Sequence, residues 1–579
     1  MITAAKAALL RQIGESVIGE GHRLDGPFGP RRITYADYTA SGRALTFVED
    51  YLREQVLPTY ANTHTEASGT GLQTSRLRED ARRLVRQALA ADDDVAVIFT
   101  GSGATAAIDK LIGILNLRIP ADLDERWQLS RHIPADQRPV VFVGPFEHHS
   151  NELAWRETVA DVVPIRADSD GHIDLAHLEA ELVAHAGRPQ LIGSFSAASN
   201  VTGILSDTHA VTRLLHRHGA LACWDFAAAA PYVDIAMNGR ATPDGEPDPE
   251  AAKDAVYLSP HKFIGGPGTP GVLALRRDLA RNRVPVVPGG GTVAFVTPTG
   301  HAYLPDVEHR EEGGTPAIVE SVRAGLVMQL KQAVGVEVIH EREGALLQRA
   351  FERWQAEPAI EILGDLRSER LAIVSFVVRP VGHRALHHHF VVAVLNDLFG
   401  IQARGGCSCA GPYGHRLLGI DAERSHAYQQ AITSGCEGFK PGWVRVNLNY
   451  FVPDHVADFV IEAVELVARH GRRLLPQYRF DPATGLWRHR LATGRPARRL
   501  TDIHYDDAGV MTYPHSLTEV PDRGAADELQ TYLREAHGLL AGLPEPPDEA
   551  AESAAHPCLA GLPDDLRWFD LPPQCLSEA

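Results

Sequence analysis

The sequence predicts an α/β protein with a central sheet covered by helices on both faces, followed by a smaller α+β module. Short apolar runs of strand length recur along the first half of the chain, at Val95–Phe99, Val140–Val143, Val162–Ile165, Gln190–Phe195, Ala220–Trp224, Ala255–Leu258 and Gly271–Leu275. Segments with helical spacing alternate with these runs, at Arg76–Ala91, Ala104–Leu117, Leu175–His185 and Thr208–His218. Strands that are apolar throughout and alternate with helices are typical of a buried sheet.

The pattern changes after Pro316. The next elements are expected at Ala317–Glu343 (one long helix or two in series), Leu371–Val378 (strand), His388–Leu398 (helix), Val444–Leu448 (strand) and Asp454–His470 (helix).

A chain of 579 residues is too long for one ordinary core, so several units are expected. Residues 1–35, a short helix and a Gly/Pro-rich stretch, are assigned to the smaller module. Residues 36–316 form the large α/β domain, and residues 317–476 form the small α+β domain. Residues 477–579 are rich in Pro, Arg and Asp with weak periodicity, which predicts a peripheral, partly ordered extension.

The bulk properties exclude several classes of function. A net charge of −18 argues against nucleic acid as a partner, because phosphate binding needs a basic face. No run of about 18 apolar residues is present, so no membrane span is expected, and the N-terminus lacks the apolar stretch of a signal peptide. Six cysteines are too few for a disulfide scaffold, so reduced thiols in a cytoplasm are expected at Cys223, Cys407, Cys409, Cys436, Cys558 and Cys575.

Lys262 is the first candidate catalytic residue. It follows the apolar strand Ala255–Leu258 and precedes the glycine-rich run at 265–268, so the chain delivers one amine into a turn. Such a lysine can form a Schiff base with pyridoxal phosphate, which then acts as an electron sink. Alone the signal is weak, because most lysines are simply solvated.

Two further strand ends carry groups that suit such a cofactor. Thr100–Thr105 joins a strand to a helix, and its glycines and the free N–H groups near Ala104 and Thr105 could hold a phosphate. A tight βα turn explains the same residues equally well. Asp225 ends a strand at the edge where ligands bind in α/β sheets, and beside a pyridinium nitrogen it would keep that nitrogen protonated. The alternative is an N-cap aspartate.

His148 and Cys409 complete the candidates that the residues themselves suggest. His148 follows the strand Val140–Val143 and could stack on a flat cofactor ring and move protons. The alternative is a loop histidine that does neither. Cys409 lies in a glycine-rich loop near Arg404, where a thiol would gain thiolate character; the alternative is an inert cysteine. The glycines indicate a mobile loop.

No metal site is expected. Cys407 and Cys409 are too few ligands for a closed site. A histidine cluster near a helix start is expected to be solvated; it comprises His383, His387, His388 and His389.

Several segments in a fixed order extend this pattern: Tyr35–Ala40, Tyr60–His64, Glu147–Asn151 with Trp155, Ser199–Gly203, Ser259–Lys262, Glu312–Pro316, Arg404–Cys409 and Arg445–Leu448. Taken together, from about Tyr35 to His470, they resemble the class V aminotransferase family of fold-type-I pyridoxal phosphate enzymes. Within that family they look most like the cysteine desulfurase and selenocysteine lyase branch.

The resemblance implies roles for the cofactor-binding residues. Asn200 would meet the cofactor hydroxyl and the substrate. Ser259 and His261 would bind the phosphate beside the Schiff-base residue Lys262. Thr315 would reach the cofactor phosphate of a neighbouring subunit, which implies a homodimer.

The resemblance also implies how the substrate is held and attacked. Arg445, with Arg404 as a further substrate-binding residue, would hold the substrate carboxylate. Cys409 matches the position of the family's nucleophile, whereas Cys407 falls where a histidine is common. Residues two apart in an extended loop project to the same side, so geometry alone does not choose between the two thiols.

Three features depart from the family's pattern. Ala228 stands where the family usually places a glutamine that bonds the cofactor's phenolic oxygen. An insert at about residues 414–442 is longer than expected and adds Cys436. The extension beyond Gln477 has no counterpart in the resemblance.

The expected protein is a cytoplasmic, homodimeric enzyme dependent on pyridoxal 5'-phosphate. It would cleave the C–S or C–Se bond of a small amino-acid substrate through a Cys409 persulfide and could pass the sulfur to an acceptor protein. One alternative is a C–S β-lyase, or another class V transformation without a persulfide. Another is a non-catalytic sulfur-relay protein.

Overall fold

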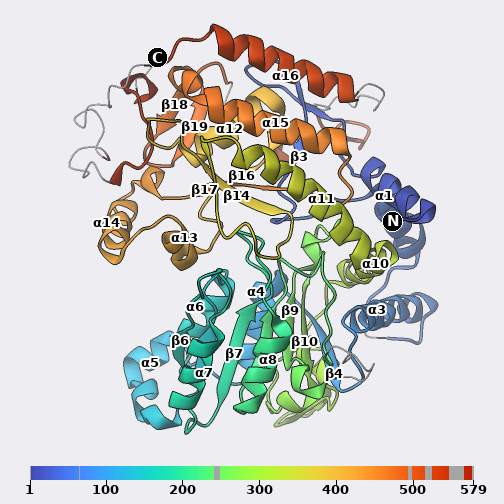
Figure 1. Ribbon diagram of the computed structural model, residues 1–579. Helices are drawn as coiled ribbons and strands as arrows, with labels where there is room; N and C mark the ends of the chain where they lie inside the picture. The colour runs from blue at the N-terminus through green and yellow to red at the C-terminus, as the bar shows by residue number, and fades with distance from the viewer. Residues whose placement is uncertain are drawn as a thin grey trace.

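A seven-stranded sheet forms the centre of the larger part of the molecule (Figure 1). The computed structural model describes residues 2–63, 65–239, 248–492, 499–514, 525–546, 558 and 566–576; His64 of the Tyr60–His64 segment lies outside these ranges. The strand order is β4-β10-β9-β8-β7-β5-β6. The strands are β4 (Val95–Thr100), β5 (Val140–Val143), β6 (Asp161–Pro164), β7 (Leu191–Ser196), β8 (Leu221–Asp225), β9 (Ala255–Leu258) and β10 (Gly271–Arg276).

All seven predicted strands are confirmed. β10 runs antiparallel to both of its neighbours, β4 and β9, and the remaining pairs of this sheet are parallel. The carboxyl ends of β5, β7, β8 and β9 therefore meet at one edge, which is where ligands bind in such sheets.

Helices cover both faces of the sheet, as the apolar strands require. In β4, Val95, Val97 and Phe99 enter one hydrophobic core, whereas Ala96 and Ile98 enter another. The first core is closed by α3 (Gly69–Ala88), α7 (Leu175–Ala184), α8 (Thr208–Arg217) and α10 (Ile318–Val334). The second is closed by α4 (Gly103–Ile114) and α6 (Ser150–Arg156).

A second, four-stranded antiparallel sheet lies above the first in Figure 1. Its order is β13-β14-β17-β16, with β13 (Ile360–Ile362), β14 (Ile373–Val378), β16 (Arg404–Gly406) and β17 (Trp443–Asn447). Helices α11 (Val336–Gln355), α12 (His388–Phe399), α15 (Asp454–His470) and α16 (Ala525–Gly542) share its core. Gly335, at φ +87°, separates α10 from α11, so the long predicted helix is two helices in series.

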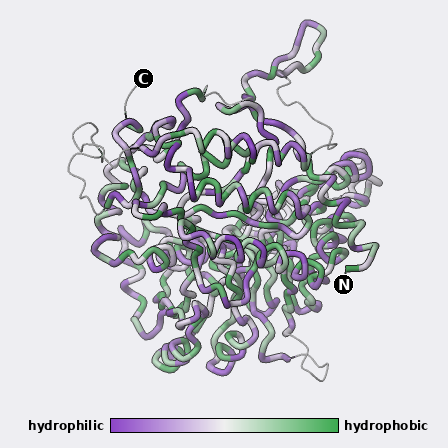
Figure 2. The backbone as a smooth tube through the Cα atoms, turned by 45° about the horizontal axis from the view of Figure 1, so that its top comes forward, coloured by the Kyte–Doolittle hydropathy of each residue, from purple (hydrophilic) through white to green (hydrophobic). Residues whose placement is uncertain are grey.

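The remaining elements are short or peripheral. The helices are α1 (Ala4–Glu15), α2 (Thr46–Tyr51), α5 (Ala121–Trp127), α9 (Val307–Glu311), α13 (Gly411–Leu417) and α14 (Ala422–Thr433). The strands are β1 (Arg23–Leu24), β2 (Arg31–Arg32), β3 (Thr34–Tyr35), β11 (Val293–Val296), β12 (His301–Tyr303), β15 (Ile401–Gln402), β18 (Tyr478–Asp481), β19 (Leu486–His489), β20 (His504–Tyr505) and β21 (Met511–Thr512). Purple and green alternate along most helices in Figure 2, as expected for amphipathic helices over a core.

The extension beyond Gln477 is less peripheral than predicted. Tyr478, Phe480, Trp487 and Phe569 are buried in the core that α12 and α15 share. Short strands and isolated aromatic residues supply this packing, and they leave little periodicity in the sequence. α16 also packs along α15 (Figure 1).

The prediction that all six cysteines are reduced is wrong for two of them. Cys436, in the insert, and Cys558, in the extension, form a disulfide across a separation of 122 residues. Cys223, Cys407, Cys409 and Cys575 are free thiols.

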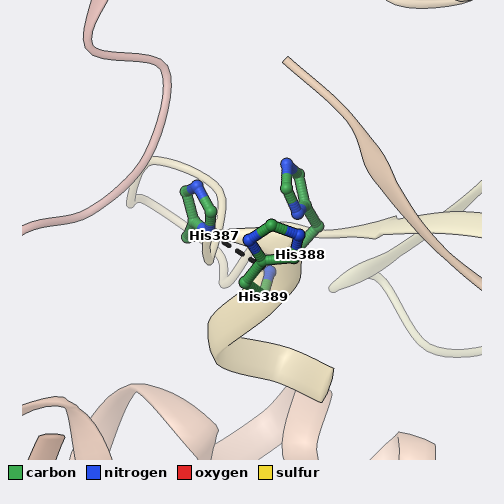
Figure 3. Close-up of side chains that lie close together, drawn as sticks. All are labelled: His387, His388 and His389. Carbon is green, nitrogen blue, oxygen red and sulfur yellow. Dashed lines mark hydrogen bonds between the residues drawn. The ribbon is translucent and has the colours of Figure 1, made fainter. Parts of the chain in front are cut away.

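The prediction that the histidine cluster is solvated is also wrong for His387 and His388, which are buried. Figure 3 shows their side chains close together with that of His389 at the start of α12. The ring Nε2 of His387 is hydrogen-bonded to the Gly438 carbonyl at 3.0 Å, and that of His388 to the Lys440 carbonyl at 3.2 Å. Both carbonyls belong to the insert. The ring of His389 bonds to the Gly485 carbonyl at 2.8 Å. These contacts attach the insert and the β18–β19 turn to the start of α12.

None of the helices in the described part of the chain combines the length and the apolar character that a membrane crossing requires.

Candidate active site

A cavity of about 220 Å³ lies at the carboxyl edge of the seven-stranded sheet, where it meets the smaller one. It brings together eleven of the twelve predicted site residues: Ala104, Thr105, His148, Asn200, Asp225, Ser259, His261, Lys262, Arg404, Cys409 and Arg445. The first and the last of these residues are more than 300 positions apart in the sequence, and the two sheets together bring them all to one place. Thr315 is not among the lining residues.

One end of the cavity has the character of an anion cradle. The backbone N–H of Ala104, in the first turn of α4, donates to Ser259 Oγ at 2.9 Å. Gly103 has φ +57°, and a Cβ there would lie 2.8 Å from Ser259 Oγ and from His261 Cε1. Only glycine allows this approach, which leaves the N-terminus of α4 open toward the cavity.

Lys262 and Asp225 form the charged centre of the cavity. Lys262 ends a short 3-10 helix, Pro260–Lys262, directly after β9. Burial lowers its pKa to about 8, and the nearby Asp225 carboxylate partly offsets this. Asp225 ends β8, is buried, and accepts the backbone N–H of Ala227 at 2.7 Å. Burial raises the pKa of Asp225, while the charge of Lys262 opposes the shift.

His148 is held as a neutral ring beside this pair. Its Nδ1 accepts the backbone N–H of Ser150 at 3.1 Å, which leaves the proton on Nε2. Burial, with a contribution from Lys262, lowers the His148 pKa to about 3.

Two arginines face the cavity from neighbouring strands of the smaller sheet. Arg404 and Arg445 are direct partners across β16 and β17. The Arg445 guanidinium donates to Asp37 Oδ1 at 2.8 Å and to the Asn200 carbonyl at 3.0 Å. Arg404 lies 3.8 Å from the other oxygen of Asp37. Burial lowers the Arg445 pKa, and the Asp37 carboxylate counteracts this effect.

Cys409 lies on a turn beside the arginines. The side-chain amide of Asn200 donates to the Ser408 carbonyl at 2.8 Å, which ties the turn to the cavity wall. Cys409 is half-buried and free. The glycine-rich loop predicted to be mobile forms a turn with long-range contacts.

Four buried polar atoms of cavity-lining residues have no hydrogen-bond partner in the described structure: Thr39 Oγ1, Asn200 Oδ1, Ser408 Oγ and Arg445 Nε. Buried polar atoms ordinarily have partners, so these suit a polar ligand. Together with the open helix N-terminus and the Lys262–Asp225 pair, they fit a cofactor with a phosphate, a carbonyl carbon and a ring nitrogen.

Sequence reasoning missed several residues in and around the site. Ser408 adjoins Cys409 and gave no separate signal. Asp37 lay within the quoted Tyr35–Ala40 segment but was given no role. Ala228 also lines the cavity, so the place where the family has a glutamine faces the site. Thr315 Oγ1 accepts the side-chain amide of Asn62 at 3.1 Å, outside the cavity.

Comparison with known proteins agrees with this architecture. The model of the family "Aminotransferase class-V" matches residues 34–422. A probable cysteine desulfurase of Streptomyces coelicolor is 28% identical over 401 residues, which covers 68% of this chain and 85% of the relative. A second one, from Staphylococcus aureus, is 27% identical over 399 residues, with 67% and 86% covered.

Solved structures share the fold. The cysteine desulfurase of Thermococcus onnurineus NA1 superposes with a TM-score of 0.59 at 21% identity, covering 75% of this chain and 94% of that one. The cysteine desulfurase CsdA of Escherichia coli gives 0.57 at 20% identity, covering 74% and 93%. The predicted fold-type-I architecture is thereby confirmed, and the chain belongs to the class-V aminotransferase family.

Proposed function

We propose that this protein is a pyridoxal phosphate-dependent cysteine desulfurase, which removes the sulfur of an amino acid through a persulfide on Cys409. The observation that carries the proposal is one cavity lined by a buried lysine, a buried aspartate, two arginines and a free thiol. The curated relatives are named probable cysteine desulfurases, which supports the same reaction.

The cofactor would be held by residues whose contacts suit its parts. The N-terminus of α4, with Ser259 and His261, would take the phosphate, and the neutral ring of His148 would lie against the pyridine ring. Asp225 would keep the ring nitrogen protonated. Bound there, pyridoxal phosphate would supply an aldehyde for Lys262 and an electron sink for charge that develops at the substrate's α-carbon.

Lys262 is suited to move the α-proton. With its pKa lowered to about 8, about a tenth of the amine is neutral at pH 7 and can accept a proton, far more than for an ordinary lysine. No other lysine lines the cavity within the described residues.

Arg445 and Arg404 would orient the substrate through its carboxylate. A guanidinium can bind a carboxylate through two parallel hydrogen bonds, and Arg445 Nε is a buried donor without a partner. Because Arg404 stands opposite Arg445 across the strand pair, both can face the same carboxylate.

Cys409 would take the sulfur. Its thiolate attacks the substrate sulfur, an S–S bond forms, and the substrate's C–S bond breaks with its electron pair left on the β-carbon. That carbon gains a proton, so cysteine becomes alanine and Cys409 becomes a persulfide. No outside oxidant or reductant is needed.

The test is product analysis with L-cysteine and a thiol reductant. The proposal predicts alanine and sulfide in equal amounts, and at least a roughly hundredfold loss of both in Cys409→Ala, as for loss of a covalent nucleophile. Cys407→Ala, on the same loop, is the matched control and keeps activity. A C–S β-lyase would instead keep its activity in Cys409→Ala and release pyruvate.

We also propose that the active form is a homodimer, because Thr315 lies outside its own cavity and by family resemblance serves the partner's phosphate. Sedimentation of the protein, with enzymatic activity measured across the sedimenting boundary, tests whether the active form is the dimer. A fully active monomer would contradict it.

A further inference from the structure

The loop that carries Cys409 contains a turn with a strained backbone. The N–H of Ala410 donates to the carbonyl of Cys407 at 3.1 Å, which closes a four-residue turn. Its two central residues, Ser408 at φ +50° and Cys409 at φ +56°, both lie in the left-handed region. Glycine or asparagine usually occupies such positions, so the surrounding structure has to hold this turn in place.

His149 supplies two of the contacts that hold it. Its backbone N–H donates to the carbonyl of Cys409 at 2.8 Å. Its ring Nε2 accepts the backbone N–H of Gly411 at 3.0 Å. The two contacts lie on either side of Ala410, so one residue grips the chain immediately after the thiol.

The ring can accept this hydrogen bond only when Nε2 carries no proton. Burial lowers the pKa of His149, and Lys440 and Arg156 act in the same direction against the opposing charge of Glu152. The neutral ring therefore predominates near neutral pH.

We propose that His149 is a positioning residue that fixes the Cys409 thiol relative to the cofactor site. His148 lines the cavity and His149 holds the cysteine turn, so two consecutive residues at the start of α6 place the cofactor ring and the nucleophile on one rigid segment. The proposal rests on the proposed function, in which Cys409 is the nucleophile.

Three variants of the full-length holoenzyme test it. His149→Phe keeps an aromatic ring without an acceptor, and His149→Gln restores an acceptor at a similar reach. His132→Phe, at an exposed histidine on the 3-10 helix Leu129–His132, is the matched control. If His149→Phe does not fold, His149→Asn replaces it, since its amide is too short to reach Gly411. The two readouts are the rate of Cys409 alkylation by iodoacetamide, followed by peptide mass, and kcat and KM for L-cysteine.

In His149→Phe we expect Cys409 alkylation to be roughly tenfold faster and kcat roughly tenfold lower, the scale of one lost hydrogen bond, with KM little changed. His149→Gln should recover most of both, and His132→Phe should match the wild type. Unchanged alkylation in His149→Phe, or a glutamine variant no better than phenylalanine, would overturn the proposal. If the wild type forms no persulfide, the proposed function fails. The alkylation comparison alone then decides whether His149 holds the Cys409 turn in place.

Discussion

Arg445 donates a 2.8 Å hydrogen bond to the carboxylate of Asp37, although 408 residues separate them in the sequence. The pair joins the segment after β3 to the central strand β17 of the smaller sheet, and Arg404 stands beside it. Asp37 thus neutralises a buried guanidinium at the place where a substrate carboxylate would arrive.

Replacing Asp37 with asparagine should therefore destabilise the protein. Removing one partner of a buried ion pair costs on the order of 3 kcal/mol, because the other charge stays buried. Thermal unfolding of Asp37→Asn should show a Tm several degrees below that of the wild type. Glu54→Gln, which breaks the exposed pair with Arg53, is the control and should change the Tm very little. Equal Tm values for the two variants would show that Asp37 does not support Arg445.

Lys262→Ala should abolish turnover while the cofactor still binds without a covalent bond. The lysine is both the Schiff-base partner and the group that moves the α-proton, so a loss of roughly a thousandfold or more in kcat is expected. Borohydride reduction of the wild type, followed by peptide mapping, should label Lys262. Lys440→Ala, at an exposed lysine, is the control. A label on any lysine other than Lys262 would refute this assignment.

Glu343, buried in α11, should make stability depend on pH. Burial raises its pKa from 4.5 to about 8, so the folded protein holds a proton that the unfolded chain releases near pH 4.5. Its contribution to stability is complete below pH 4.5 and declines as the pH rises toward 8. In Glu343→Gln this decline should be absent, and the variant should gain in Tm relative to the wild type between pH 5.5 and 8.5.

The exposed Glu337, on the same helix, provides the control for that experiment. Glu337→Gln should follow the wild-type pH profile. A wild-type profile that matches that of Glu343→Gln would mean that Glu343 does not bind a proton on folding.

The Cys436–Cys558 disulfide should stabilise the attachment of the extension. A crosslink across 122 residues limits the unfolded chain, and losing one typically costs about 2–4 kcal/mol. Reductant should lower the Tm of the wild type but leave that of Cys558→Ser unchanged. Alkylation of unfolded, unreduced protein should modify four of the six cysteines. Modification of all six would contradict the crosslink.

The sequence predicts the large sheet well because its strands are apolar on both faces, as β5 and β9 illustrate. Residues at the strand ends, such as Asp225 and Lys262, are also predicted well, since the carboxyl edge of a parallel sheet gathers them. These parts follow from local patterns.

Features that depend on distant segments could not be predicted in this way. His387 is buried because residues such as Trp568 and Phe480 pack against it from the extension. The pairing of Cys436 with Cys558 has no local signal. The role of His149 depends on the left-handed turn at Cys409, and nothing in the residue types there indicates positive φ angles.

The measurement that tests the account most directly is mass spectrometry of the protein after one turnover with L-cysteine, quenched with a thiol alkylator. One extra sulfur is expected on Cys409, formed together with one equivalent of alanine. A persulfide only on Cys407, or none on either residue while alanine or pyruvate still forms, would contradict it.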